Sequence, residues 1–246
     1  MRRLPAFLAA LALILSLSAG AAADLMNVGG TLRYYDEQGR EAEEIGLDLS
    51  QFNHQVDFPA LRAQGFSFVV IRLGGRGWGG TGRLYGDRET RSGLRRAREA
   101  GLRVGAYFYS TAINTAEAIE EAADAIAILD GFPLDLPLYI DMEYSGDYPA
   151  GRADRLSPGT RADIIEAFCT AVRGAGYDAG LYASEGYLRF DLDTEAARYL
   201  PVWMASYTVE NRLPQYVNDW TVWQQTDSTF AGGVDGAFDL NLVLRH

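Results

Sequence analysis

The sequence predicts an α/β protein in which a parallel barrel forms a single domain. Apolar segments typical of strands alternate with amphipathic segments typical of helices over most of residues 45–246. The chain of 246 residues is long enough for one such barrel with a substantial core. The helical signal weakens after about residue 200, which predicts an incomplete barrel whose last strands lack partner helices.

Residues 1–23 have the pattern of a secretory signal. Arg2 and Arg3 precede an apolar run that ends in small residues at Ala21–Ala23. We therefore expect cleavage near Ala23 and a secreted or periplasmic protein. The alternative is an uncleaved membrane anchor, because the apolar run is nearly long enough to span a bilayer. We expect no other contact with the membrane.

The composition excludes several classes of chemistry. Without residues 1–23 the chain would carry 20 arginines against 33 acidic residues, a formal charge of −13, so we expect no nucleic-acid partner. The sequence contains no lysine, one cysteine (Cys169) and two histidines, His54 and His246. Schiff-base enzymes and P-loop NTPases are excluded, and zinc clusters lack ligands. We expect no cofactor, no metal, a buried free thiol at Cys169 and a monomer.

The elements follow in order along the chain. Residues 24–44 are expected to form a short hairpin or linker, with a turn at Asp36–Gly39. Strands are expected at residues 45–50, 66–73, 102–109, 136–142, 179–182, 202–205, 220–226 and 236–242. Helices are expected at residues 57–62, 89–100, 115–129, 158–175 and 194–199.

Two carboxylates one residue apart follow the strand in the middle of the chain. Side chains alternate faces along a strand, so Asp141 and Glu143 should point one way while Ile140 and Met142 point the other. Two acids at one site should have different pKa values, one raised and one low, as in glycosidases. Solvated loop starts and metal sites are the alternatives for such a pair.

Further acids and tyrosines lie at strand ends. Asp48 ends the first strand of the barrel, Tyr107 and Tyr109 end the third, and Asp239 lies on the last. Active sites of parallel barrels form at the carboxyl ends of the strands. We therefore expect the four acids, Asp48, Asp141, Glu143 and Asp239, to meet at one mouth.

A glycine-rich stretch, Gly75–Gly80, has the spacing of a dinucleotide-binding loop. No helix begins at its last glycine, so we reject that interpretation. We expect a mobile substrate loop whose Arg76 and Trp78 reach into the cleft, with a plain surface loop as the alternative.

Aromatic residues gather after the strands, and aromatic faces suit the apolar faces of pyranose rings. The candidates for sugar contact are Trp78, Tyr107, Tyr109, Tyr144, Tyr148, Tyr182, Trp203, Tyr207 and Trp223. Ordinary packing is the alternative for each, and we favour sugar contact for Tyr107 and Trp203. Gln224 could bind a sugar or satisfy backbone groups, and His54 lies near enough in sequence to touch the same mouth.

An ordered set of motifs resembles family 25 of the glycoside hydrolases, the secreted muramidases. The motifs are Gly46–Ser50, Gly105–Phe108, Ile140–Glu143, Pro201–Tyr207, Trp223–Gln225 and Phe238–Asn241. The resemblance covers about residues 45–246. The loop with Arg72, Arg76 and Trp78 resembles one branch of the family.

The resemblance implies a flattened, irregular β/α barrel as the catalytic domain, and a peptidoglycan glycan strand as substrate. The bond cleaved would be the β-1,4 bond between N-acetylmuramic acid and N-acetylglucosamine. Glu143 would be the general acid and Asp141 would assist through the N-acetyl group. Asp48 and Asp239 would hold the sugar, with Tyr107 and Arg72 lining the cleft.

From the residues alone, two other functions stay open. A chitinase-like enzyme on the same scaffold would cleave N-acetylglucosamine polymers. A non-catalytic glycan-binding protein would keep the cleft without turnover, although such a protein has no reason to keep a mutually repelling acid pair. The residues themselves support a retaining or substrate-assisted carbohydrase with Glu143 as the acid.

Overall fold

The structure, a computed structural model, describes residues 24–53, 55–88, 90–146, 151–192, 194–207, 213–214 and 219–244. The predicted signal at 1–23, His54 and Tyr148 lie outside the described residues. Among those described, no helix is long and apolar enough to cross a bilayer.

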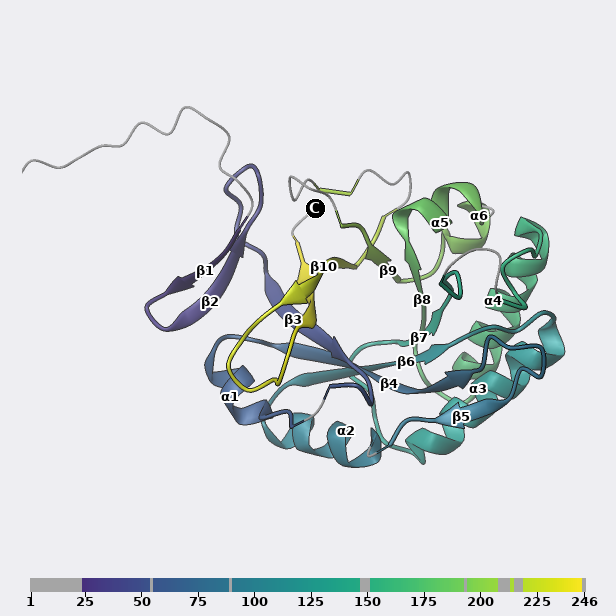
Figure 1. Ribbon diagram of the computed structural model, residues 1–246, viewed down its shortest axis with the longest axis horizontal. Helices are drawn as coiled ribbons and strands as arrows, with labels where there is room; N and C mark the ends of the chain where they lie inside the picture. Colours follow the sequence, from purple (N-terminus) through teal and green to yellow (C-terminus); the bar gives the residue numbers. More distant parts are fainter. Residues whose placement is uncertain are drawn as a thin grey trace, which may run out of the picture.

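Eight strands close into a barrel (Figure 1). They are β3 (Glu44–Leu49), β4 (Phe68–Arg76), β6 (Arg103–Tyr109), β7 (Leu138–Asp141), β8 (Ala179–Ser184), β9 (Val202–Ala205), β10 (Val222–Thr229) and β11 (Phe238–Val243). Closure comes from the parallel pairing of β3 with β4. The predicted α/β barrel is confirmed.

Helices accompany only the first part of the barrel within the described residues. They are α1 (Phe58–Ala63), α2 (Thr90–Glu99), α3 (Thr115–Leu129), α4 (Pro158–Gly174), α5 (Glu185–Phe190) and α6 (Thr194–Ala197). In Figure 1, α1, α2 and α3 lie below the strands and α4 and α5 lie to the right. Asn114 and Ser157 cap α3 and α4 by accepting hydrogen bonds from first-turn amides, as their side chains suit them to do. Helix α5 was not expected from the sequence.

The last strand runs against the others. Strand β11 pairs antiparallel with both β10 and β3, whereas the strands from β3 to β10 pair in parallel around the rest of the barrel. Its first residues therefore lie at the mouth formed by the carboxyl ends of the parallel strands. Asp239 stands opposite Asp48 in this register. The fully parallel barrel expected from the sequence is wrong at this strand, because a short β10–β11 connection leaves no room for a crossover helix.

Two layers of apolar side chains surround the strands. Ile140 and Met142 face outward into the core between strands and helices, which also buries Cys169 as a free thiol. Inside the barrel a second cluster of mostly aromatic residues fills the floor. Glycines make room for it: a Cβ on Gly46 would stand 2.5 Å from the Phe68 ring, and one on Gly180 would stand 2.5 Å from Tyr139.

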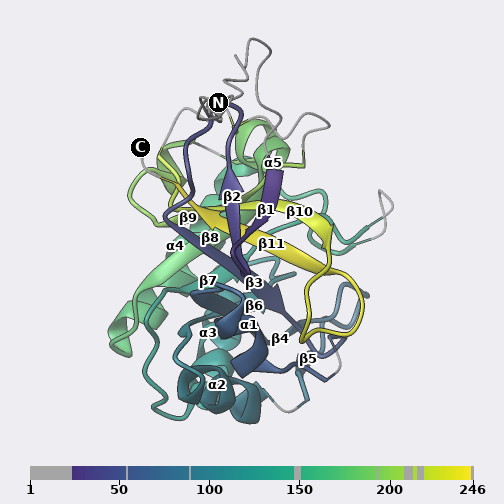
Figure 2. The same ribbon diagram turned by 90° about the vertical axis from the view of Figure 1, so that its left-hand side faces the viewer.

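The N-terminal segment forms a hairpin that packs on the barrel. Strands β1 (Asp24–Val28) and β2 (Thr31–Tyr35) pair antiparallel around a turn at Gly29–Gly30. Positive φ angles at both glycines permit this turn. The expected turn at Asp36–Gly39 also forms, because the Gly39 backbone nitrogen donates to the Asp36 carbonyl oxygen at 2.8 Å. Tyr34 is buried and meets Trp223 edge to face, with ring centroids 6.0 Å apart. The hairpin lies to the left of the barrel in Figure 1 and in front of it in Figure 2.

A further strand, β5 (Leu84–Gly86), was also not expected. It pairs antiparallel with the end of β4, which continues through Gly74 and Gly75 to Arg76. A Cβ on Gly74 would lie 2.2 Å from the carbonyl oxygen of Tyr85, so the glycines permit close approach of two strands. The expectation that the strand ends before these glycines, with the chain continuing as a mobile loop, is therefore wrong.

Candidate active site

The four predicted acids come from three strands of the barrel, β3, β11 and β7. Asp48 lies near the end of β3, Asp239 near the start of β11, and Asp141 ends β7 with Glu143 just beyond it. In addition to burial, the charges of Glu143 and Asp48 raise the pKa of Asp141, and the charge of Asp239 raises the pKa values of Asp48 and Glu143. The structure therefore brings the four carboxyls to one mouth.

Asp48 and Asp239 act as one acidic pair. Burial, followed by the charge of Asp239, raises the pKa of Asp48 well above its usual range. Burial also raises the pKa of Asp239 to about 6, while a hydrogen bond from Asp48 opposes the rise. Asp48 thus holds a proton that it donates to the Asp239 carboxylate.

A buried amide network fixes this pair. Gln224 donates to Asp48 Oδ2 at 2.7 Å and to Asp239 Oδ2 at 3.1 Å, and Asn241 donates to Asp48 Oδ2 at 2.8 Å. The Gln224 carbonyl oxygen accepts from the Tyr182 hydroxyl at 2.7 Å and from the Tyr207 hydroxyl at 2.5 Å. All four hydrogen-bonding positions of the Gln224 amide are used inside the protein. The predicted contact of Gln224 with a sugar is therefore wrong; it orients the acids.

Trp203 is also part of this support. Its indole nitrogen donates to Asn241 Oδ1 at 2.7 Å, and its ring packs against Tyr107, Tyr139 and Tyr182. The side chain is 1% exposed, so it offers no face to a sugar. The prediction that Trp203 stacks on a pyranose ring is wrong, because the barrel interior is wide enough to enclose it. Tyr107 and Tyr182, each 8% exposed, reach the cleft only at their edges.

The central pair stands on the opposite side of the mouth from the β3–β11 pair. Burial, then the charge of Glu143, raises the pKa of Asp141 well above its usual range, and Arg72 opposes this. Asp141 Oδ1 is buried without a hydrogen-bond partner. An unpaired buried carboxyl oxygen is costly, which marks it as a group that a ligand donor could satisfy.

Glu143 is exposed through the open mouth, with protein on its other sides. This partial burial raises its pKa to about 7, with the charge of Arg72 acting in the opposite direction. The sequence reading expected one raised and one low pKa in the pair. Both are raised, because burial acts on the two carboxyls alike.

The positive charge of Arg72 acts on both central acids, since it opposes the rise in the pKa values of Asp141 and Glu143. It lies on β4, in register with Tyr107, and its Nε donates to Asp87 Oδ2 at 2.8 Å. Asp87 also accepts from the backbone nitrogen of Gln51 at 2.8 Å, so it fixes both the arginine and the loop after β3. Tyr109 pairs in register with Asp141, and its pKa is raised by burial and then by the charge of Glu143.

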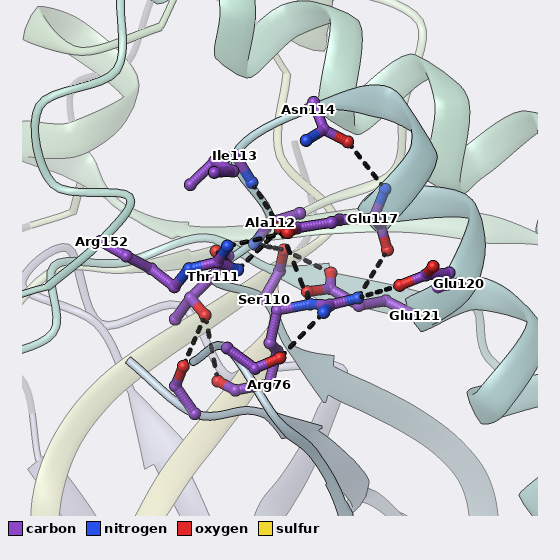
Figure 3. A network of polar contacts seen from close by, with 12 residues as sticks. Arg76, Ser110, Thr111, Ala112, Ile113, Asn114, Glu117, Glu120, Glu121 and Arg152 are labelled. Carbon is purple, nitrogen blue, oxygen red and sulfur yellow. Dashed lines mark hydrogen bonds and ion pairs between the residues drawn. The ribbon is translucent and has the colours of Figure 1, made fainter. Parts of the chain in front are cut away.

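Arg76 lies against Glu120 and Glu121 of α3 (Figure 3). It is 5% exposed and donates to Glu121 at 2.8 Å, to Glu120 at 3.0 Å and to the carbonyl oxygen of Gly82 at 2.9 Å. Arg152 binds both carboxylate oxygens of Glu117 at 2.7 Å. These pairs fasten the glycine-rich loop to α3, so the expectation that Arg76 enters the cleft is wrong. Trp78 on the same loop is 52% exposed, and its contact with substrate stays a prediction.

Three residues near the acids were missed from the sequence. Asn241 could have been found, because it lies two residues after Asp239 and so shares its face of the strand. Asp87 and Tyr85 could not, since they depend on the register of the unexpected strand β5. No group of three metal-ligating side chains occurs among the residues described.

Comparison with known proteins decides the family. The sequence model described as "Glycosyl hydrolases family 25" matches residues 47–234. The chain belongs to glycosyl hydrolase family 25. The match covers the barrel strands from β3 to β10 and leaves the β1–β2 hairpin outside.

Relatives in this family include proteins that lyse cell walls. An autolytic lysozyme of Clostridium acetobutylicum is 25% identical over 197 residues, covering 80% of this chain and 54% of the relative. The chain thus spans about half the length of that protein. The structure of the spore cortex lytic enzyme SleM of Clostridium perfringens has a TM-score of 0.71 at 25% identity, covering 81% of this chain and 67% of that one.

A third structure shares the fold. The modular autolysin LytC of Streptococcus pneumoniae, in complex with a synthetic peptidoglycan ligand, has a TM-score of 0.75 at 20% identity. It covers 89% of this chain and 52% of LytC. The closed barrel of this chain is therefore also the fold of the matching part of LytC.

Proposed function

We propose that this family 25 chain is a peptidoglycan hydrolase with lysozyme activity. Its substrate would be the glycan strand, and the bond cleaved would be the β-1,4 bond between N-acetylmuramic acid and N-acetylglucosamine. One observation carries the proposal: four carboxyls with perturbed ionisation converge at the mouth of a family 25 barrel. The cell-wall-lytic names of two relatives support it.

In this proposal Glu143 is the general acid that protonates the leaving oxygen. A pKa of about 7 keeps it protonated under mildly acidic conditions while leaving it able to give up the proton. Its exposure through the mouth gives a glycosidic oxygen access to the carboxyl.

Asp141 would assist from within the barrel. Its unpaired Oδ1 is an acceptor for the amide N–H of the substrate's N-acetyl group, and that hydrogen bond would lower the raised pKa of Asp141 and favour its ionised form. The ionised Asp141 would then stabilise positive charge as the N-acetyl oxygen attacks the sugar carbon. Asp48 and Asp239 would hold the same sugar from the other side.

Exposed aromatic side chains at the rim would bind neighbouring sugars. Trp78 is 52% exposed and Tyr207 is 51% exposed, so both have ring faces available for pyranose stacking. Secretion or export to the periplasm belongs to the same proposal, since the glycan lies outside the cytoplasm. Its support is the signal pattern at residues 1–23.

Digestion of purified peptidoglycan tests the function. The mature protein and its Glu143→Gln variant are incubated with peptidoglycan, and new reducing ends are identified by borohydride reduction and mass spectrometry. We expect reduced muramic acid from the wild type and none from the variant, because the amide cannot deliver a proton. Reduced N-acetylglucosamine would instead indicate a glucosaminidase or chitinase-like enzyme. No new ends at any pH would indicate a glycan-binding protein.

A further inference from the structure

A cavity of about 770 Å³ adjoins the active-site mouth. It lies between the loop after β3, the end of β4 and the start of α2, with Ser50, Arg72 and Thr90 among the residues that line it. The volume falls in the range of pockets that bind small ligands. None of the four acids lines it, so it is a space beside the reaction centre.

Arg72 connects this cavity with the acids. The side chain lines the cavity, and its charge also lowers the pKa values of Asp141 and Glu143. Phe52, 70% exposed, lies at the cavity edge with the Arg72 guanidinium 5.1 Å from its ring centroid. A group in the cavity is therefore next to the sugar that the acids bind.

The described lining of the cavity is positively charged in a protein whose net charge is −11. Three arginines, Arg72, Arg88 and Arg96, face one acid, Asp87, which is already paired with Arg72 at 2.8 Å. Arg88 and Arg96 are exposed. Arginine presents several fixed donors and binds carboxylates well. The charge favours an anionic occupant.

The remaining polar lining suits peptide groups. Gln51, Asn53 and Gln55 contribute side-chain amides from the loop after β3. Asn53 Oδ1 already accepts from the Ser50 backbone nitrogen at 2.9 Å, so Asn53 offers N–H donors, whereas the other two amides can both donate to and accept from a peptide backbone. Amides and arginines together match a short peptide that carries carboxylates. A phosphate polymer would accept hydrogen bonds from the arginines and the amide N–H groups but would offer no donor to the amide oxygens.

We propose that this cavity binds the anionic peptide stem carried by the muramic acid sugar at the acids. The inference rests on the proposed function, since it assumes a peptidoglycan strand in the mouth. It makes the enzyme selective for strands that retain their peptides. Arg88 and Arg96 bind the stem carboxylates, and the loop after β3 binds its backbone.

The experiment compares peptide-bearing glycan strands with strands stripped of peptides by an amidase. Both substrates are first freed of phosphate polymers with hydrofluoric acid. We expect the wild type to prefer peptide-bearing strands, and the variant Arg88→Gln/Arg96→Gln to lower the ratio of the two kcat/KM values by about tenfold. Arg95→Gln is the matched control, because Arg95 is exposed on the same helix and lines a different pocket.

Arg88→Glu provides a second variant, since Arg96 also donates to the Val56 carbonyl oxygen and its loss could disturb folding. Charge reversal at Arg88 should lower the ratio of kcat/KM on peptide-bearing strands to kcat/KM on stripped strands at least as much as Arg88→Gln alone. An unchanged ratio in correctly folded variants would overturn the inference. So would an effect of the arginines that appears only on strands still carrying phosphate polymers.

A binding measurement separates this inference from the proposed function. Calorimetry follows a soluble disaccharide-peptide binding to the Glu143→Gln variant, with and without the arginine substitutions. Roughly tenfold weaker binding on substituting Arg88 and Arg96, but not Arg95, supports the peptide site even if the wild type cleaves nothing. Equal binding to the Glu143→Gln protein, to its form with Arg88 and Arg96 substituted and to its form with Arg95 substituted would refute the peptide site, whatever the activity of the wild type.

Discussion

Replacing Gln224 with leucine should change the pH dependence of activity. The substitution keeps the approximate size of the side chain and removes the two hydrogen bonds donated to Asp48 and Asp239 at 2.7 and 3.1 Å. Donors stabilise the ionised form of a carboxyl, so their loss raises its pKa. One such bond contributes about 1.5 kcal/mol, which corresponds to about one pKa unit.

The rate effect follows from the two limbs of the pH profile. We expect wild-type activity to rise as the Asp48–Asp239 pair loses its first proton near the Asp239 pKa of about 6, and to fall as Glu143, the proposed acid, loses its proton at about 7. If the pKa of the Asp48–Asp239 pair, which sets the acidic limb, rises by about one unit, the fraction of correctly protonated enzyme falls about fivefold at pH 6. At pH 7 it falls by less than about twofold. The loss is therefore concentrated on the acidic side.

The assay is kcat/KM on soluble glycan strands between about pH 4 and pH 9, which reports the free enzyme. Gln64→Leu is the control, because Gln64 donates to the backbone oxygens of Ala60 and Gly232 and contacts none of the four acids. The control should keep the wild-type profile even if it loses some stability. A Gln224→Leu enzyme with an unmoved acidic limb would refute the role given to this amide.

Three further predictions concern stability. Burial holds the pKa values of Asp48 and Asp239 in the folded protein above their values in the unfolded chain, so the free energy of unfolding should fall as pH rises from about 4 through about 6. Asp48→Asn should flatten this pH dependence in denaturant titrations. An equally steep dependence in that variant would contradict the pairing of Asp48 with Asp239. Arg76→Leu should lower the free energy of unfolding by about 3–5 kcal/mol, because it leaves the buried Glu121 carboxyl without the guanidinium that binds it at 2.8 Å. A loss below about 1 kcal/mol in urea unfolding would show that the Arg76–Glu121 ion pair contributes little. Tyr34→Ala should cost about 3–5 kcal/mol by removing a buried ring from Trp223; an unchanged melting temperature would mean that the hairpin is not part of the folded unit.

Much of the scaffold could be predicted because it depends on local pattern. The order of strands and helices follows from apolar periodicity, and the shared direction of Asp141 and Glu143 follows from the alternation of side chains along a strand. The meeting of Asp48, Asp141 and Glu143 at one rim follows from the geometry of parallel barrels, and these inferences need no knowledge of which strand pairs with which. Asp239 joins them only because β11 runs antiparallel, which the sequence did not predict.

The errors arose where non-local packing decides the outcome. Gly74 and Gly75 indicated a loop by composition, but they permit strand β5 to approach β4, a contact that only register can reveal. Trp203 sits at a strand end as expected, yet its burial depends on three tyrosines from other strands. The full internal use of the Gln224 amide likewise depends on partners far apart in the sequence.

The role of Glu143 as the general acid is tested most directly with a substrate whose leaving group needs no protonation. Rates of wild type and Glu143→Gln are compared on glycan strands and on an aryl glycoside of N-acetylmuramic acid, whose phenolate leaves without protonation. The account predicts a loss of at least about a hundredfold on glycan strands, with much of the rate retained on the aryl glycoside. An equal loss on both substrates would contradict the assignment of Glu143 as the acid.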